Sequence, residues 1–363
     1  MTARLRVALV GLGDIGLGAH LPALRLRADV DVVALVDRDP ARRAAAEASL
    51  AEPPRFAFVA GDREETPPRG TAPRGAAAAP LLVDSLAATL DGGLDAVVLA
   101  TPPWATPELA VDALGAGCFV LAEKPIATSV TAAAQLAALP GDALARLQVG
   151  LTYRHDPALE RLAAWIADGR LGERPLLVRA HVYDERRVDD DPEHAERVAA
   201  ALRHGSPMLH DGAHLMDWLA LLLGDGAEVD DGWAASMDPD APAPHLTGAR
   251  LRWPDGTLAV VEVGWWLREL PRCELEVLGE RGRALLDLRT FALRGWFGGE
   301  VEDVAFPGER IPRAFAIQLE RFVALCRGAR STAMPGLREA LASLGLSERI
   351  EAAAGLRPVE VVA

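Results

Sequence analysis

Residues 208–217 gather side chains that can move protons. If this stretch is helical, a rotation of 100° per residue places His210, His214 and Asp217 within about 60° of one another. Asp211 lies at the edge of that stripe, and the opposite side carries apolar residues: Met208, Leu215, Met216, Leu219 and Leu223. Imidazoles and carboxylates on one face can take up and release protons near neutral pH. The stretch therefore predicts a proton-transfer site, with a solvated helix face as the alternative.

A glycine-rich turn near the start of the chain indicates a second kind of chemistry. The apolar run at residues 6–10 predicts a buried strand, which ends in Gly11-Leu12-Gly13-Asp14-Ile15-Gly16 before a predicted helix. Glycine suits Gly11 for the tight turn, Gly13 for close approach of a pyrophosphate and Gly16 for helix–strand packing. The helix N-terminus would offer free N–H groups and a positive dipole end to the phosphates. A glycine-rich turn without a nucleotide is the alternative.

An acidic residue at the end of the next strand completes the dinucleotide pattern. Residues 30–36 predict a strand that ends in Asp37, 21 residues after Gly16. Asp37 can accept hydrogen bonds from both ribose hydroxyls, which favours NAD and repels a 2′-phosphate. Arg38 follows directly and could bind that phosphate, so NADP is the alternative cofactor.

A lysine follows a further buried strand. Residues 118–122 predict this strand, which ends in Glu123-Lys124-Pro125. Ligands of an open α/β sheet bind outside the carboxyl ends of its strands, so we expect Lys124 where the nicotinamide ring and the substrate meet. Its amine can hydrogen-bond the hydroxyl or carbonyl that reacts, and Pro125 biases Lys124 away from helical geometry. A lysine that only caps the edge of the sheet is the alternative.

The elements around these motifs predict a doubly wound parallel sheet in the first 150 residues. Residues 95–101, closed by Pro102-Pro103, and residues 148–152 predict further strands, and residues 107–116 predict a helix. Pro22 should kink the first helix or end its first segment. Residues 60–80 are rich in Pro, Gly and Ala, which predicts a flexible surface insertion.

The rest of the chain alternates between helix and hairpin patterns. The predicted elements are helices at 157–167 and 313–327 and strands at 175–183, 246–253, 257–266, 273–279 and 283–288. A charged segment at 184–197 predicts a solvated loop or short helix, with a lid over the site as the alternative, and residues 358–362 predict a terminal strand or tail. Trp253, Trp265 and Trp266 suggest an aromatic sheet face, which we assign to a subunit interface rather than to a sugar platform.

With these motifs in this order, the chain resembles the glucose–fructose oxidoreductase / inositol dehydrogenase / MocA (Gfo/Idh/MocA) family nearly end to end. The resemblance rests on Gly11-x-Gly13-x-x-Gly16, Asp37, Ala100-Thr101-Pro102-Pro103, Glu123-Lys124-Pro125, Tyr153-Arg154-His155-Asp156-Pro157, Gly169-Arg170-Leu171-Gly172 and the helix from His210 to Asp217. It implies a Rossmann domain, expected at residues 1–150. It also implies a C-terminal α/β domain with an open, mostly antiparallel sheet, expected at residues 151–363 for substrate binding and for assembly into a homodimer or homotetramer.

The resemblance also implies roles for individual residues. Members of the family oxidise or reduce sugars, cyclitols and related polyols with NAD(P), and their usual catalytic lysine and histidine fall on Lys124 and His214. We expect Asp211 to assist catalysis, and Arg154, His210 and Asp217 to bind the substrate. The residues expected at the cofactor are Gly11, Gly13, Asp14, Ile15, Gly16, Asp37, Arg38, Thr101, Pro102, Glu123 and Lys124.

The leading hypothesis is hydride transfer between nicotinamide and a sugar, cyclitol or related polyol or carbonyl compound, with His214 or a His214–Lys124 relay moving the proton. An NAD-dependent, glycosidase-like enzyme with no net redox change is one alternative. A non-catalytic nucleotide- and sugar-binding regulator is another, because His210 replaces the family's usual aspartate and Thr106 a frequent histidine. A metal enzyme is the weakest, because the i, i+4 spacing of His210 and His214 comes without a recognised metal signature.

The composition limits the partners of the protein. The 363 residues are half hydrophobic, enough for two domains with sizeable cores, and the formal charge of −14 repels nucleic acid and anionic membranes. The three cysteines, Cys118, Cys273 and Cys326, show neither zinc spacing nor a secretory disulfide framework. No apolar run reaches the roughly 18 residues of a membrane span, and the first residues lack a signal-peptide pattern. We therefore expect a cytoplasmic protein with a small-molecule substrate and no nucleic-acid or membrane partner.

Overall fold

The computed structural model describes residues 3–57 and 79–356. The described residues form two compact units: one within Met1–Ala127, Thr131–Thr152 and Gly308–Glu339, the other within Thr128–Val130, Tyr153–Pro307 and Ala340–Ala363. The insertion expected at 60–80 lies almost wholly outside the described residues, and the terminal segment at 358–362 lies wholly outside them. The functions assigned above to residues 1–150 and 151–363 stay predictions.

The first unit is built on six parallel strands. These are β1 (Leu5–Val10), β2 (Val30–Val36), β3 (Leu81–Val83), β4 (Ala96–Leu99), β5 (Phe119–Glu123) and β6 (Leu147–Gly150), in the order β3-β2-β1-β4-β5-β6. This is the doubly wound order, in which the chain reverses direction across the sheet between β1 and β4. All four residues of β4 are buried, which explains its continuous apolar run. The predicted Rossmann sheet is confirmed.

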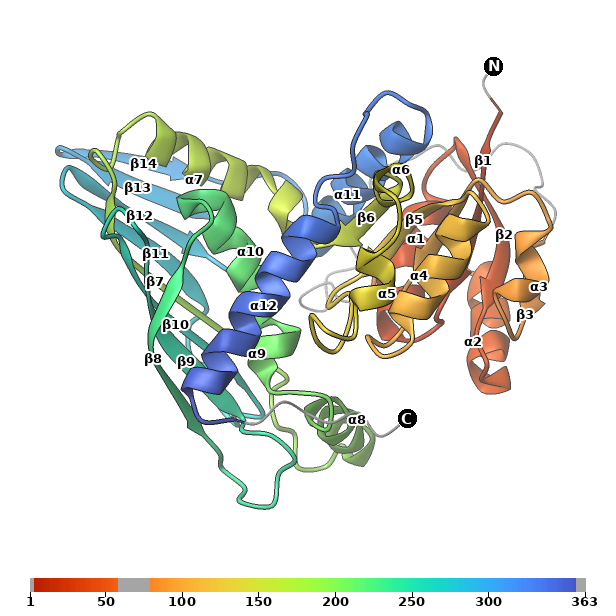
Figure 1. Ribbon diagram of the computed structural model, residues 1–363, viewed down its shortest axis with the longest axis horizontal. Coiled ribbons are helices and arrows are strands. Elements are labelled where there is room, and N and C mark those ends of the chain that lie inside the picture. Colours follow the sequence, from red (N-terminus) through yellow and green to blue (C-terminus); the bar gives the residue numbers. More distant parts are fainter. Residues whose placement is uncertain (1–2, 58–78, 357–363) are drawn as a thin grey trace. The chain divides into compact units, whose positions relative to one another are not determined.

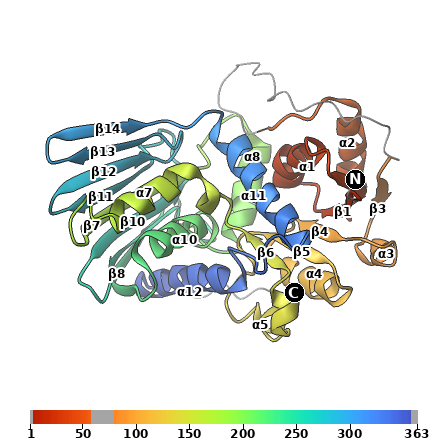
Figure 2. The same cartoon turned by 90° about the horizontal axis from the view of Figure 1, so that it is seen from above.

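Helices cover both faces of this sheet. They are α1 (Leu21–Arg25), α2 (Pro40–Ala51), α3 (Ala87–Leu90), α4 (Thr106–Gly115), α5 (Ala134–Ala137), α6 (Gly141–Leu144) and α11 (Arg310–Cys326), with a π-helical turn η1 (Gly16–His20) before α1. Figure 2 shows α1 and α11 on one side of the sheet and α4 and α5 on the other. Helix α11 comes from far along the chain, and its Phe315, Leu319 and Phe322 join the same core cluster as Val7 and Leu9 of β1.

Helix α1 runs through Pro22 to Arg25, and the segment directly before α1 is the π-helical turn η1. The N–H of Leu21 reaches back five residues to the carbonyl oxygen of Gly16. Pro22 has no N–H to donate to the carbonyl of Gly18, and that carbonyl accepts a hydrogen bond from Ala57 N at 2.9 Å instead. The turn ends at His20, whose side chain is buried.

The second unit is built on eight strands. They are β7 (Pro175–Asp184), β8 (Glu228–Ala235), β9 (Leu246–Arg252), β10 (Leu258–Trp265), β11 (Glu274–Gly279), β12 (Gly282–Asp287), β13 (Leu293–Phe297) and β14 (Glu300–Val304). Their order is β14-β13-β12-β11-β7-β10-β9-β8, and every neighbouring pair is antiparallel except β7 and β10. The predicted open, mostly antiparallel sheet and its two hairpins are confirmed.

One face of this sheet is covered by helices. The helices of the unit are α7 (Pro157–Ala167), α8 (Pro192–Leu202), α9 (Pro207–His210), α10 (Gly212–Leu223) and most of α12 (Leu337–Ala353), and a 3₁₀ turn η2 (Thr152–His155) precedes α7. Figure 1 shows α7, α10 and α12 along one face of the eight strands. Residues on that face form the core of the unit, including Val178, Val261 and Val277 of the sheet and Leu215 and Leu219 of α10.

The prediction that Trp253, Trp265 and Trp266 form an exposed aromatic face of the sheet is wrong. Trp253 and Trp265 are 4% and 5% exposed, because both lie on the helix-covered side of the sheet. Trp266 follows the end of β10 and packs against His194 of α8, with ring centroids 5.4 Å apart. The period-two pattern of these strands shows which residues share a face of the sheet but not which face the helices cover. The helices cover the face that carries Trp253 and Trp265.

Candidate active site

The three glycines of the first turn meet different surroundings. Gly11 has a φ of +88°, and a Cβ there would lie 2.3 Å from the carbonyl oxygen of Ala100. A Cβ on Gly16 would lie 2.0 Å from the carbonyl oxygen of Gly11, so the packing of the protein itself requires both residues to be glycine. A Cβ on Gly13 would meet nothing nearer than Arg42 Nη1 at 3.7 Å. Packing therefore does not explain a glycine here, whereas close approach of a ligand does.

The surroundings of the turn fit a dinucleotide. Asp14 and Ile15 begin the helix at the carboxyl end of β1, and both are exposed. The Asp37 carboxylate accepts hydrogen bonds from Leu12 N at 2.8 Å and Asp39 N at 2.9 Å, so it braces the turn from the end of β2. Its remaining lone pairs leave acceptors for ribose hydroxyls.

Two arginines lie beside this acidic residue. Arg38, expected at the cofactor, is exposed at the start of the loop after β2. Arg42 of α2 was not singled out from the sequence, yet its Nη1 lies 3.8 Å from Asp37 Oδ2. Asp37 precedes α2 and stands five residues before Arg42, so no helical spacing marked this pair in the sequence.

The Thr-Pro-Pro segment after β4 is a hydrogen-bonded turn. Thr106 Oγ1 lies 2.9 Å from Thr101 Oγ1 and donates to one of the carbonyl oxygens of Thr101 and Pro102, at 3.1 and 3.0 Å. Thr106 is fully buried. Its small hydroxyl closes the turn that carries Thr101 and Pro102, and in this way it has a structural role of its own.

Lys124 stands at the carboxyl end of β5 and is half-buried. Its backbone N–H donates to Glu123 Oε2 at 3.1 Å, and the peptide bond to Pro125 is cis. The other carboxylate oxygen, Glu123 Oε1, lies 2.8 Å from Nε2 of the buried His20. The Glu123 carboxylate, expected at the cofactor, thus binds groups of the protein on both of its oxygens. His20 was missed from the sequence, where it stands four residues after Gly16 without any other marker.

Lys124 is the only lysine of the chain, and the other 37 of its 38 lysine and arginine residues are arginines. An arginine keeps its charge at any ordinary pH, whereas a lysine amine can release its proton when its surroundings favour the neutral form. A sequence that otherwise uses arginine throughout retains an amine at this one position. This compositional signal was available from the sequence and is independent of any motif.

The stretch expected as one continuous helix is broken at Asp211, where α9 ends and α10 is about to begin. The polar residues of this stretch therefore have two different sets of neighbours, one before the break and one after it. His210 stacks on the Trp265 ring at 5.2 Å, with its Nε2 3.1 Å from the carbonyl oxygen of Ala201 in α8. Asp211 Oδ2 accepts a hydrogen bond from Trp265 Nε1 at 2.7 Å. These contacts tie His210 and Asp211 to β10 and α8, and their expected roles at the substrate stay predictions.

The other half of the stripe faces η2. The His214 ring lies 4.8 Å from that of Tyr153, at an interplanar angle of 60°, and stacks on Trp218 at 6.2 Å. Asp217 is 1% exposed, and both of its carboxylate oxygens accept from Arg154 Nε, at 2.9 and 3.0 Å. Arg154 is therefore held by an acidic side chain one helical turn from His214. Tyr153 was another residue that sequence reasoning did not assign to the site.

Other chemistries find less support. Within residues 3–57 and 79–356, no group of three or more His, Cys, Asp or Glu residues is arranged to hold a metal ion. Burial raises the pKa of all three cysteine thiols, that of Cys326 to about 12, so none is a ready nucleophile. Among the described residues, no helix is both long enough and apolar enough to cross a membrane.

Comparison with known proteins identifies the family. Residues 5–151 match the oxidoreductase family with an NAD-binding Rossmann fold, and residues 159–285 match the GFO/IDH/MocA C-terminal domain. Myo-inositol dehydrogenase Hyg17 of Streptomyces leeuwenhoekii is 30% identical over 242 residues, covering 65% of this chain and 71% of that protein. Inositol 2-dehydrogenase of Mycolicibacterium gilvum is 28% identical over 251 residues, covering 67% of each. The chain belongs to the GFO/IDH/MocA family of oxidoreductases, which confirms the expected enzyme class and nicotinamide dinucleotide cofactor.

Solved structures share the fold over nearly the whole chain. An oxidoreductase from Agrobacterium radiobacter, in complex with NAD+, L-tartaric acid and magnesium, superimposes with a TM-score of 0.76 at 18% identity and 97% coverage of both chains. The WlbA dehydrogenase from Bordetella pertussis, in complex with NADH and UDP-GlcNAcA, gives 0.71 at 24% identity, also with 97% coverage of both.

Alanine at Gly13 and at Gly16 should have different effects. Because a Cβ on Gly13 would make only an ordinary contact with Arg42, Gly13→Ala should fold normally and bind NAD at least about tenfold more weakly, which corresponds to about 1.4 kcal/mol. Gly16→Ala should lower the melting temperature, because its Cβ would overlap a backbone carbonyl. Calorimetric NAD titration and thermal unfolding of both variants would check this, and unchanged NAD affinity of Gly13→Ala would contradict it.

Removal of Asp217 should destabilise the protein by more than removal of the whole ion pair. Asp217→Leu leaves the Arg154 charge without its buried partner, which typically costs about 3–5 kcal/mol, whereas the double variant Arg154→Met/Asp217→Leu should recover part of that loss. Urea unfolding of the two single variants and the double variant measures the coupling. Additive effects would show that the pair contributes nothing specific.

Proposed function

We propose that the protein is an NAD-dependent dehydrogenase that oxidises a secondary hydroxyl of a cyclitol, sugar or related polyol, or catalyses the reverse reduction. The observation that carries this proposal is Lys124, the one lysine of the chain, at the carboxyl end of β5 in a sheet whose β1 end forms the glycine cradle. Relatives named as inositol dehydrogenases, such as those of Streptomyces and Mycolicibacterium, support the choice of a cyclitol.

The proposed roles follow from what each side chain can do. NAD+ supplies the hydride acceptor at C4 of its nicotinamide ring. Lys124 hydrogen-bonds the reacting oxygen, and His214 takes the hydroxyl proton, as the family resemblance implies. Arg154, oriented by Asp217, offers its guanidinium to a further hydroxyl of the substrate. Tyr153 packs against the His214 ring and so limits the directions in which that imidazole can point.

We propose NAD rather than NADP as the working cofactor. The Asp37 carboxylate is fixed by two backbone N–H groups at the end of β2, where a 2′-phosphate would meet its negative charge. Arg38 and Arg42 are the groups that would favour NADP, because a guanidinium can bind a 2′-phosphate. The guanidinium of Arg42, however, lies near the Asp37 carboxylate, which partly neutralises its charge. The ratio of the dissociation constants for NAD and NADP decides between the two cofactors.

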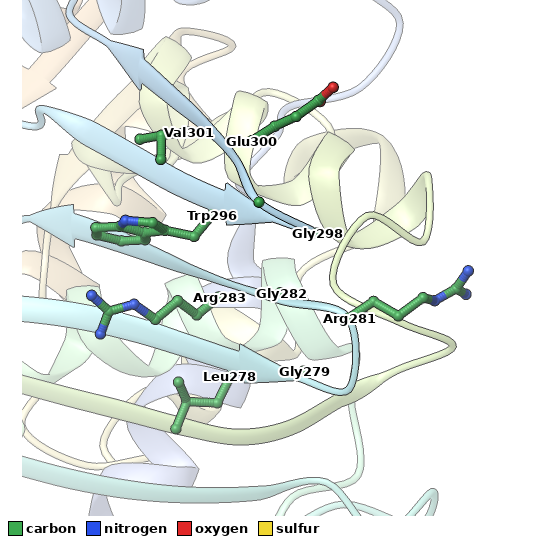
Figure 3. Close-up of a pocket in the computed structure, with 10 residues that line it drawn as sticks. Leu278, Gly279, Arg281, Gly282, Arg283, Trp296, Gly298, Glu300 and Val301 are labelled. Atoms are coloured by element: carbon green, nitrogen blue, oxygen red, sulfur yellow. The ribbon is translucent and has the colours of Figure 1, made fainter.

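We further propose a cytoplasmic homodimer or homotetramer. Three free cysteine thiols suit a reducing compartment. The face of the second sheet opposite its helices carries a shallow hollow lined by Leu278, Arg283, Trp296 and Val301 from four neighbouring strands (Figure 3). Val301 is 56% exposed, and apolar side chains of this kind favour contact with another subunit.

The mass of the protein in solution tests the assembly. Light scattering coupled to gel filtration should give two or four times the monomer mass of 38.5 kDa. In that case the charge-introducing change Val301→Arg should lower the mass while leaving the fold intact, because its side chain is exposed. A monomeric wild-type protein at micromolar concentration would contradict the proposal.

Loss of turnover with retained cofactor binding tests the catalytic assignment. With NAD+ and a panel of cyclitols, sugars and polyols, the wild-type protein should accumulate reduced nicotinamide. Lys124→Arg keeps the charge but not the compact amine, and His214→Gln keeps a polar side chain but not the base, so each should lower kcat by about 10²–10⁴-fold. Both should bind NAD nearly as the wild type does, which calorimetry checks.

Three other outcomes would redirect the assignment. NAD binding with product formation but no reduced nicotinamide would favour the glycosidase-like alternative. NAD binding without any conversion would favour a regulator. Full activity of Lys124→Arg would show that the lysine is not required.

A further inference from the structure

A buried chain of contacts leads from the glycine-turn helix to the backbone of Lys124. His20 ends the π-helical turn η1, and its Nε2 lies 2.8 Å from Oε1 of Glu123 at the end of β5. The second oxygen of that carboxylate accepts the N–H of Lys124 at 3.1 Å. His20 is 3% exposed and Glu123 8%, so water competes little with either contact. Because a carboxylate only accepts hydrogen bonds, the imidazole must donate from Nε2.

Neighbouring residues pack closely around the Glu123 carboxylate and its partner His20. Gly150 of β6 pairs with Glu123, and a Cβ on it would lie 2.8 Å from Glu123 Oε1. Only a glycine leaves room for the side chain to lie across the neighbouring strand toward His20. Phe315 of α11 meets the His20 ring edge-on, with centroids 5.1 Å apart. Two elements besides its own strand, η1 and β6, thus lie against the Glu123 carboxylate, whereas α11 packs only against the His20 ring.

We propose that His20 is a positioning residue for Lys124. Through Glu123 it fixes the helix that begins at the glycine turn to the peptide that carries Lys124, so the lysine amine and the dinucleotide cradle keep a constant spacing. The π-helical turn has a part in this, because it is the segment that carries the imidazole. The inference rests on the proposed function, in which Lys124 acts on the substrate oxygen.

Three substitutions separate positioning from general packing. His20→Met fills a similar volume without a hydrogen-bond donor to Glu123. His20→Gln is the conservative variant, because its amide nitrogen can reach the place of Nε2 and donate. Phe315→Leu is the matched control: it removes the ring packed against His20 in the same buried cluster but leaves the Glu123 contacts in place.

The single lysine provides a readout that needs no substrate. Reductive methylation of the full-length protein with ¹³C-formaldehyde labels Lys124 and the α-amino group alone, and Lys124→Arg identifies the lysine signal. The methyl resonance should shift or split in His20→Met and return to its wild-type position in His20→Gln. It should stay unchanged in Phe315→Leu, although that variant lowers the melting temperature. Should His20→Met fail to fold, Glu123→Gln, which weakens the contact by removing the charge, should move the signal in the same way.

Kinetics of the unlabelled proteins give the functional consequence. His20→Met should lower kcat by about 10²-fold, as displacement of a catalytic group by about 1 Å does, with NAD affinity and KM close to wild type. His20→Gln should recover most of that loss.

An unchanged lysine signal in His20→Met, or the same signal in His20→Met and Phe315→Leu, would overturn the inference. So would equal loss of kcat and of NAD affinity, which indicates general damage. Absence of wild-type turnover on every substrate would contradict the proposed function alone, since the lysine signal still decides this inference.

Discussion

Parallel strand order is the constraint on which the first unit depends. In a parallel sheet all carboxyl ends meet at one edge, so the turn after β1 and the Lys124 peptide after β5 must emerge on the same side. Strand β4 lies between them and is fully buried, so β1 and β5 are two inter-strand spacings apart, about 10 Å. The residues that follow the strands therefore determine the chemistry at this edge of the sheet. Gly13, which has little protein around it, follows β1, and Lys124, the only lysine of the chain, follows β5.

The second unit positions its polar groups by a different device. Two consecutive helices, α9 and α10, lie along one face of a mostly antiparallel sheet, and the break between them at Asp211 divides their side chains between two sets of aromatic neighbours. Trp265 holds the part before the break, and Tyr153 and Trp218 contact His214 after it. Aromatic rings are rigid and make directional contacts at little entropic cost, so they suit the task of fixing an imidazole. The buried Arg154–Asp217 pair adds a charged contact to the same segment.

Local sequence patterns predicted much of this fold. The bounds of β2 and α7 agree with the structure to the residue, because apolar runs and the Asp156-Pro157 helix start are local signals. The break at Asp211 was missed because the apolar periodicity continues through it and its backbone stays near helical values, although Asp-Gly is a turn signal. The tryptophans of the sheet were assigned to the wrong face because period-two alternation does not say which face is covered. His20 was missed because its partner, Glu123, is 103 residues away. Contacts that distant follow from strand order and packing, and no local pattern contains them.

We propose that Lys124 lies at the nicotinamide of a dinucleotide held by the glycine turn. Magnetisation transfer between the ¹³C-methylated lysine and bound NAD in the full-length protein tests this placement. Because the chain has one lysine, the signal has a single origin once the α-amino group is assigned. We expect nuclear Overhauser contacts from this methyl group to the nicotinamide protons and none to the adenine protons. Contacts to the adenine instead, or none to either ring while NAD is bound, would contradict it.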